Sequence, residues 1–448
     1  MKAGFGKNDI TPRVGVELAG FGPFLCRKST AIRDPLSARA LVVEHGHTRA
    51  ALISCDLLGV PLWLTRRIRE RVQRETGIPA DAVMLHCTHT HSGPALGPYI
   101  GWGEPDQPYL ETLPQRVAKA VGAAAGSLRD ATLLHAEVPC AGIGLNRECD
   151  RDAQPLDDVL RDDWRPARPE LTDTTCHVLR VDIDGRTAGV LTYFGCHPVV
   201  CCQETHYIHG DYCGVACSAL EREHPGSTFM FLQGANGDVN SCVVHKPEQA
   251  SLLALDVIAG RFARAVRSGM SASRPVTVDE VRCIRRAPSL ARRPWSIEKL
   301  RQMLGEKEAI LAQPHATDAL PAQPSNIRME VVFAVALRRM IAQAEGGQPY
   351  PPVELQGLRL GPVALLGAPF EIMQAVKNDI RAAARSQVPL VMSVTNDTLG
   401  YAPDRTCAAR GGYAADIVPL MGGFVPFANL HDDLVRELGA LEAALSSH

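Results

Sequence analysis

Three histidines fall in the segment HCTHTH, at residues 86, 89 and 91. In an extended strand, side chains two residues apart share a face and lie about 6.6 Å apart along it. His89 and His91 can therefore point into one cavity. With this spacing, one histidine can bind a metal ion while the other contacts substrate or a metal-bound water. The alternative is that both are polar residues at the end of a strand and bind no metal.

Further ligand-type side chains lie far from this segment. His197 precedes a proline in GCHP, Glu371 ends the segment PFE, and Tyr401 follows a strand-like run. Each has a structural alternative: a hydrogen-bonded histidine, a carboxylate at a helix N-terminus, and a half-buried ring. Two imidazoles and a carboxylate form a set that suits one Zn²⁺ ion with an open position for water. Iron or manganese would accept the same set.

Six short apolar runs precede most of these side chains. They cover residues 50–55, 82–87, 189–195, 228–232, 363–367 and 390–394. Runs of this length without polar alternation indicate strands buried on both faces. Ligands bind at the carboxyl ends of such strands. Because an unpaired ionisable group in a core costs several kcal/mol, we expect the polar residues that follow the strands to form one site. These residues are Asp56, His89, His91, His197, Asp238, Glu371, Asp397 and Tyr401.

Helical patterns alternate with the strands. They cover residues 64–76, 109–125, 252–268 and 372–386, and this alternation predicts an α/β (mixed α+β) fold. We expect a single catalytic domain over residues 1–448. Within it, residues 285–352 are rich in Arg, Gln, Ala and Pro, with helical runs at 296–312 and 327–344. This stretch is interpreted as a helical excursion that acts as a lid.

Composition narrows the class of partner. The chain has 448 residues, 46% of them hydrophobic, and a net charge of −2. The sequence has no stripe of basic residues of the kind that binds nucleic acid. No apolar run reaches about 18 residues, so no transmembrane segment is expected. A small-molecule substrate is the predicted partner. The first residues lack the apolar core of a signal peptide, which predicts a cytoplasmic protein with its 14 cysteines reduced.

Together these motifs resemble the neutral/alkaline ceramidase family, over nearly the whole chain. The segments that carry the resemblance are AGFGKNDITP (3–12), RDPLSARALVV (33–43), THTHSGP (88–94), LNR (145–147), GCHP (195–198), GDYCG (210–214), FLQGANGDVN (231–240), PFE (369–371) and a stretch ending near GGY (411–413). The resemblance implies stacked central β-sheets flanked by helices. It also implies the short form of the family, without a C-terminal immunoglobulin-like domain.

The resemblance further implies roles for individual residues. His89, His197, Glu371 and Tyr401 match the zinc ligands of the family. His91 and Arg147 match residues near the scissile amide, where they would hold or polarise the carbonyl. From the motif FLQGANGDVN, we expect Asp238 to orient a ligand histidine.

One departure from the family pattern bears on function. The family has a serine after the glutamine of its QSNxGDV motif, and this chain has Gly234 there. The first hypothesis is a zinc-dependent hydrolase that cleaves an amide (N-acyl) bond by attack of a metal-bound water. The second keeps the zinc site but targets an ester, lactone or glycosidic bond, with Gly234 making room for a bulkier group. The third is a non-catalytic binding protein of the same fold.

Overall fold

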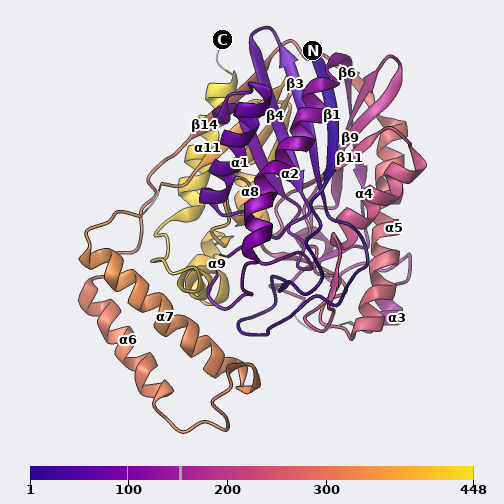
Figure 1. Cartoon of the computed structure of the whole chain (residues 1–448). Helices are drawn as coiled ribbons and strands as arrows, with labels where there is room; N and C mark the ends of the chain where they lie inside the picture. Colours follow the sequence, from indigo (N-terminus) through magenta and orange to yellow (C-terminus); the bar gives the residue numbers. More distant parts are fainter. Residues whose placement is uncertain (98, 151–153, 351, 447–448) are drawn as a thin grey trace.

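The computed structural model describes residues 1–97, 99–150, 154–350 and 352–446. Its centre is two stacked β-sheets with helices on their outer faces (Figure 1). The nine-stranded sheet has the order β11-β9-β8-β6-β1-β3-β4-β5, with β13 beside β6. Its strands are β1 (Lys2–Asp9), β3 (Ser37–His45), β4 (Thr48–Cys55), β5 (Val83–Cys87), β6 (Arg129–Pro139), β8 (Thr175–Ile183), β9 (Arg186–Phe194), β11 (Thr228–Gln233) and β13 (Arg274–Val276). The four-stranded sheet has the order β14 (Val281–Arg286), β15 (Leu355–Leu360), β16 (Val363–Gly367), β18 (Val388–Met392).

Apolar side chains of the two sheets meet in a shared core. Leu52 and Leu191 of the larger sheet belong to one buried cluster with Leu358, Leu365 and Leu390 of the smaller sheet. The outer faces are covered by helices, so most strands are buried on both sides. This arrangement confirms the predicted mixed α/β fold with stacked sheets and flanking helices.

The covering helices come in pairs. Helices α1 (Leu62–Thr76) and α2 (Gln107–Gly126) cover one part of the larger sheet, and α4 (Asp211–Glu223) and α5 (Glu248–Ala272) cover another. Helices α8 (Gln374–Ala383) and α11 (Leu430–Ser446) cover the smaller sheet (Figure 1). None of the helices in the described ranges is long and apolar enough to span a bilayer. The 14 cysteines are free thiols, and most are buried.

The six predicted strands form three parallel pairs. Strand β4 pairs with β5, β9 with β11, and β16 with β18. The two strands of a parallel pair have their carboxyl ends at the same edge of the sheet. The loops that follow all three pairs can therefore meet, even though the pairs belong to two different sheets.

A helical hairpin projects from this body (Figure 1). It consists of α6 (Ile297–Leu311) and α7 (Ser325–Glu345), which coincide with the two helical runs of the predicted excursion. The helices pack on one another, with ion pairs such as Arg338–Glu308 between them. Residue 351 of the predicted excursion lies outside the described residues. A lid role for this hairpin stays a prediction.

Glycines in β1 allow α2 to approach the sheet closely. A Cβ atom at Gly6 would lie 2.1 Å from the carbonyl oxygen of Ala120 in α2. We expect Gly6→Ala to lower the free energy of unfolding by about 1–3 kcal/mol, because helix and strand would have to separate. Urea unfolding measures the effect. The control is Gly122→Ala, at an open position of α2, which should stabilise the protein by about 0.5–1 kcal/mol. Equal shifts in both variants would contradict this account.

Candidate active site

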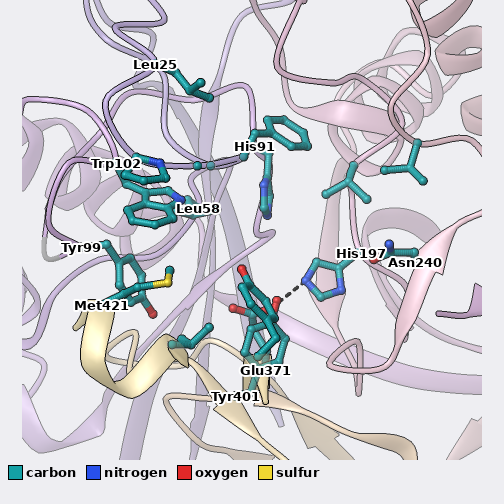
Figure 2. Close-up of a pocket in the computed structure, with 18 of the residues that line it drawn as sticks. Leu25, Leu58, His91, Tyr99, Trp102, His197, Asn240, Glu371, Tyr401 and Met421 are labelled. Carbon is teal, nitrogen blue, oxygen red and sulfur yellow. Dashed lines mark hydrogen bonds and ion pairs between the residues drawn. The ribbon is translucent and has the colours of Figure 1, made fainter. Parts of the chain in front are cut away.

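A cavity of about 460 Å³ lies where loops from both sheets meet. Six of the seven residues to which the sequence analysis assigned individual roles line it, and Figure 2 shows how several of them face its centre. These residues are His89, His91, Arg147, His197, Glu371 and Tyr401. The described residues of the hairpin also contribute, through the first turn of α7. The structure thus brings together side chains that are up to 312 residues apart in the chain, as 401 − 89 shows.

The loop after β5 holds His89 in an unusual backbone conformation. Its φ is +72°, which is uncommon for a residue with a Cβ and costs about 1–3 kcal/mol. The backbone N–H donates to the carbonyl of Leu57 at 2.9 Å, and the ring Nδ1 lies 2.7 Å from the carbonyl oxygen of Leu58. A carbonyl oxygen only accepts hydrogen bonds, so Nδ1 carries the proton. The lone pair of Nε2 is therefore free to face the cavity.

His197 follows β9 and is oriented in the same way. Its Nδ1 lies 2.6 Å from the carbonyl oxygen of Asn236, so Nδ1 is the donor and Nε2 carries a lone pair. This Nε2 lies 2.7 Å from Oε2 of Glu371 (Figure 2). Burial lowers the pKa of His197 to about 4, so the ring is neutral at neutral pH.

The carboxylate of Glu371 is thus surrounded by lone pairs. Its Oε2 lies 2.7 Å from the Nε2 of His197 and 3.4 Å from the Nε2 of His89. Atoms that are all acceptors repel one another at such distances unless a proton or a metal cation lies among them. This donor arrangement fits a bound metal ion.

The distances around His89 agree with that fit, whereas the 2.7 Å between Nε2 of His197 and Oε2 of Glu371 is a hydrogen-bond length that a bound ion would have to widen. Ligands about 2.0–2.1 Å from a tetrahedral ion lie about 3.3–3.4 Å from each other. The Nε2 of His89 lies 3.4 Å from the Nε2 of His91 and 3.4 Å from Oε2 of Glu371. Ligand atoms of His89, His91 and His197 all lie within 4.8 Å of one another. His91 is therefore a candidate ligand as well as a candidate substrate contact.

His91 is held by packing more than by hydrogen bonds. Its ring lies 5.0 Å from that of Phe21, and Arg27 donates a hydrogen bond to its backbone carbonyl. A Cβ at Gly20, whose φ is +92°, would lie 2.4 Å from its Nδ1, so glycine is required there. Burial, followed by the nearby imidazoles, lowers the pKa of His91 well below its ordinary value. Its ring is neutral, and its Nδ1 has no partner among the described residues.

Tyr401 and Arg147 form the wall beside Glu371. The short strands β17 (Glu371–Ile372) and β19 (Tyr401–Ala402) pair in parallel, which places Glu371 next to Tyr401. The guanidinium of Arg147 lies 4.9 Å from the ring centre of Tyr401. Burial raises the pKa of Tyr401 well above its usual value, although Arg147 opposes this shift. Arg147 therefore places a permanent positive charge at the cavity wall.

Asp238 does not make the predicted contact with a ligand imidazole. Its carboxylate accepts hydrogen bonds from the backbone N–H of Gln374 at 2.9 Å and from Nδ2 of Asn146 at 3.1 Å. It lines a separate pocket. The group that orients His197 is the carbonyl of Asn236. Asp238 instead supports Arg147, whose backbone N–H donates to the carbonyl of Asp238 at 2.9 Å.

Gly234 also lies away from the cavity lining. A Cβ there would lie 2.9 Å from the hydroxyl oxygen of Tyr193, inside the core. The prediction that Gly234 makes room for a bulkier substrate is therefore wrong. Two further polar residues at strand ends are structural: Asp56 pairs with Arg39 at 2.7 Å, and Asp397 accepts from the backbone N–H of Leu62 at the start of α1.

Several cavity residues were not predicted. Tyr413 packs 5.7 Å from Tyr401 between ring centres, and Asn240 lies beside His197 (Figure 2). Tyr99 and Trp102 form an aromatic wall opposite. Asn240 directly follows the GDV segment, and its place beside this motif could have identified it as a site residue. For the aromatic side chains, no pattern in the sequence distinguishes a cavity wall from a core.

The fold and the site define an α/β protein of two stacked sheets with a histidine-rich, metal-type centre. The sequence profile described as "Neutral/alkaline non-lysosomal ceramidase, N-terminal" matches residues 1–247, which is more than half of the chain. The chain therefore belongs to the neutral/alkaline ceramidase family, a family of amidohydrolases. This confirms the resemblance inferred from the motifs.

Two solved structures share the fold. The neutral ceramidase from Pseudomonas aeruginosa matches with a TM-score of 0.77 and 19% identity, over 99% of this chain and 74% of that one. A structure described as "Ceramidase complexed with C2" matches with a TM-score of 0.75 and 18% identity, over 99% and 75% of the two chains. At these identities the likeness concerns the fold.

Proposed function

We propose that this protein hydrolyses the amide bond of an N-acyl substrate at a zinc centre formed by His89, His197 and Glu371. The observation that supports it most is the convergence of the Nε2 atoms of His89 and His197 on the carboxylate of Glu371. Imidazole and carboxylate donors are the set that Zn²⁺ prefers in catalytic sites. Tyr401 is placed to complete the set. A zinc ion held there supplies a Lewis acid that activates water near neutral pH and polarises a carbonyl.

Residues around the centre can carry the remaining steps. Arg147 keeps its charge in a buried position, where it would stabilise the negative charge that develops on the carbonyl oxygen. His91 is neutral and opens to the cavity. We assign it the transfer of a proton through Nε2, taken from the attacking water and returned to the leaving nitrogen.

The opposite wall of the cavity suits an acyl chain. Leu25, Leu58, Tyr99, Trp102 and Met421 line this side (Figure 2). Apolar walls with a few polar groups at one end are typical of small-molecule sites. An apolar chain lying there would place its carbonyl near Arg147 and Glu371. This arrangement agrees with an amide of a fatty acyl chain as substrate.

A glycosidic substrate fits the cavity less well. Most glycosidases use two carboxyl groups on opposite sides of the bond. Among the described residues that line the cavity, Glu371 is the only carboxylate, and it faces the imidazoles. An amide or ester therefore matches the side chains better than a glycoside does.

Metal removal tests the proposal. The purified protein is expected to contain about one zinc ion per chain and to release free amine from N-acyl substrates. Treatment with a chelator should abolish this release, and added Zn²⁺ should restore it. Matched esters and glycosides in the same assay show which bond is preferred. Full turnover after the metal has been removed would refute the zinc mechanism.

A further inference from the structure

The cavity lining has more positive than negative side chains, and one of the positive side chains has no role in the proposed catalytic steps. Two arginines line it, Arg147 and Arg328, and the only carboxylate among its described lining residues is Glu371. Glu371 faces His89 and His197, and Arg147 stacks on Tyr401. Arg328 is left without an anionic partner.

Arg328 lies in the first turn of α7, where the hairpin meets the cavity. Its Nη1 donates to the carbonyl of Pro23 at 3.1 Å, and its Nε is buried without a hydrogen-bond partner. Within the described ranges, no carboxylate pairs with this guanidinium. Arg338 of the same helix, by contrast, forms an ion pair with Glu308 at 2.6 Å. Arg328 differs from Arg338 because it lines the cavity and has no carboxylate partner among the described residues.

A half-buried guanidinium with an unused donor favours an anion over a neutral group. Because Nε is enclosed and Nη1 bonds to Pro23, an incoming carboxylate would meet the Nη2 end of the guanidinium, and such charge-assisted bonds are stronger than neutral ones. The surrounding wall adds no competing negative charge, since the first turn of α7 contains no acidic residue. The apolar side chains beside it, such as Met329 and Leu25, would keep the pair from being fully screened by water.

We infer that the substrate is an N-acyl compound that carries a carboxylate away from the scissile bond, and that Arg328 binds this carboxylate. The inference rests on the proposed amide hydrolysis and narrows its substrate class. Hydrolysis breaks the C–N bond, adds a hydroxyl to the acyl carbon and a proton to the nitrogen. The carboxylate that Arg328 holds is unchanged by this reaction.

The test compares matched amides in the native protein and in Arg328→Gln. N-octanoylglycine carries the carboxylate on the amine half, the mono-ethylamide of octanedioic acid carries it on the acyl half, and N-octanoylglycinamide is neutral. The native protein should prefer one of the two anions over the neutral amide. Arg328→Gln should lower kcat/KM for that anion by about 10- to 100-fold and change the neutral amide by less than about 2-fold. Arg328→Lys should retain part of the preference.

Two further measurements separate the possible failures. Arg338→Gln, on the same helix but away from the cavity lining, should leave all three rates unchanged. N-(octylsulfonyl)glycine, which has no amide carbonyl to cleave, and its neutral amide report binding without chemistry. Arg328-dependent binding of the anion with no amide cleaved would contradict the proposed function and support the carboxylate site. The inference would be overturned if the native protein cleaved anionic and neutral amides at equal rates. It would also be overturned if Arg328→Gln lowered kcat/KM equally for both.

Discussion

The variant His197→Ala is expected to lose its bound zinc and at least about 10³-fold of its amide hydrolysis. Two effects add in this variant. One ligand of the metal is removed, and once the ion is lost the buried carboxylate of Glu371 has no counter-charge among the described lining residues beside it. A buried charge without a partner is strongly destabilising, so a lower unfolding midpoint is expected as well. Metal content, kcat/KM and thermal unfolding measure the loss of zinc, of activity and of stability separately.

The control for this variant is His47→Ala. His47 is exposed in the turn between β3 and β4, far from the cavity lining. This variant should keep the zinc content and the activity of the native protein. His197→Ala that folds normally and retains full zinc content would show that the ion is held elsewhere, and the proposed centre would have to be abandoned.

Arg147→Met is expected to reduce kcat/KM about 10²- to 10³-fold while zinc content stays the same. Methionine is an unbranched apolar side chain, so it retains part of the buried packing but removes the charge that would stabilise the oxyanion. Because this interaction is strongest in the transition state, the loss should appear mainly in kcat. Arg147→Lys should give an intermediate rate, since lysine keeps the charge but lacks the planar group that stacks on Tyr401.

Arg129→Met is the matched control. Arg129 pairs with Asp184 on the surface, where both side chains are more than two-thirds exposed. Its replacement should leave kcat and KM unchanged. A loss of zinc from Arg147→Met would show that this residue supports the metal centre, and its proposed role at the oxyanion would then be wrong.

The six predicted strands differ in residue pattern from β6 and β8, which were not predicted. The six predicted strands are short apolar runs, and all of them form parallel pairs. Strands β6 and β8 were not singled out, because polar residues such as His135, Glu137 and Arg180 interrupt their apolar residues. Both are antiparallel to their neighbours, and such strands tolerate polar side chains on one face.

The sequence by itself determined which residue types are available at the strand ends. His89, His197 and Glu371 follow buried apolar runs, and ionisable groups at such positions require a common partner. The order of the motifs also indicated the family. These properties depend on local composition and spacing, and they are readable without coordinates.

Only the tertiary structure decided how these side chains are oriented. The carbonyls of Leu58 and Asn236 fix the protonated nitrogen of each ligand histidine, and every residue has a carbonyl, so no sequence pattern marks these two. The same is true of Asp238, which bonds to Asn146 and a backbone N–H instead of an imidazole. Backbone groups and loop paths are set by the packing of the whole chain, and residue types alone do not specify them.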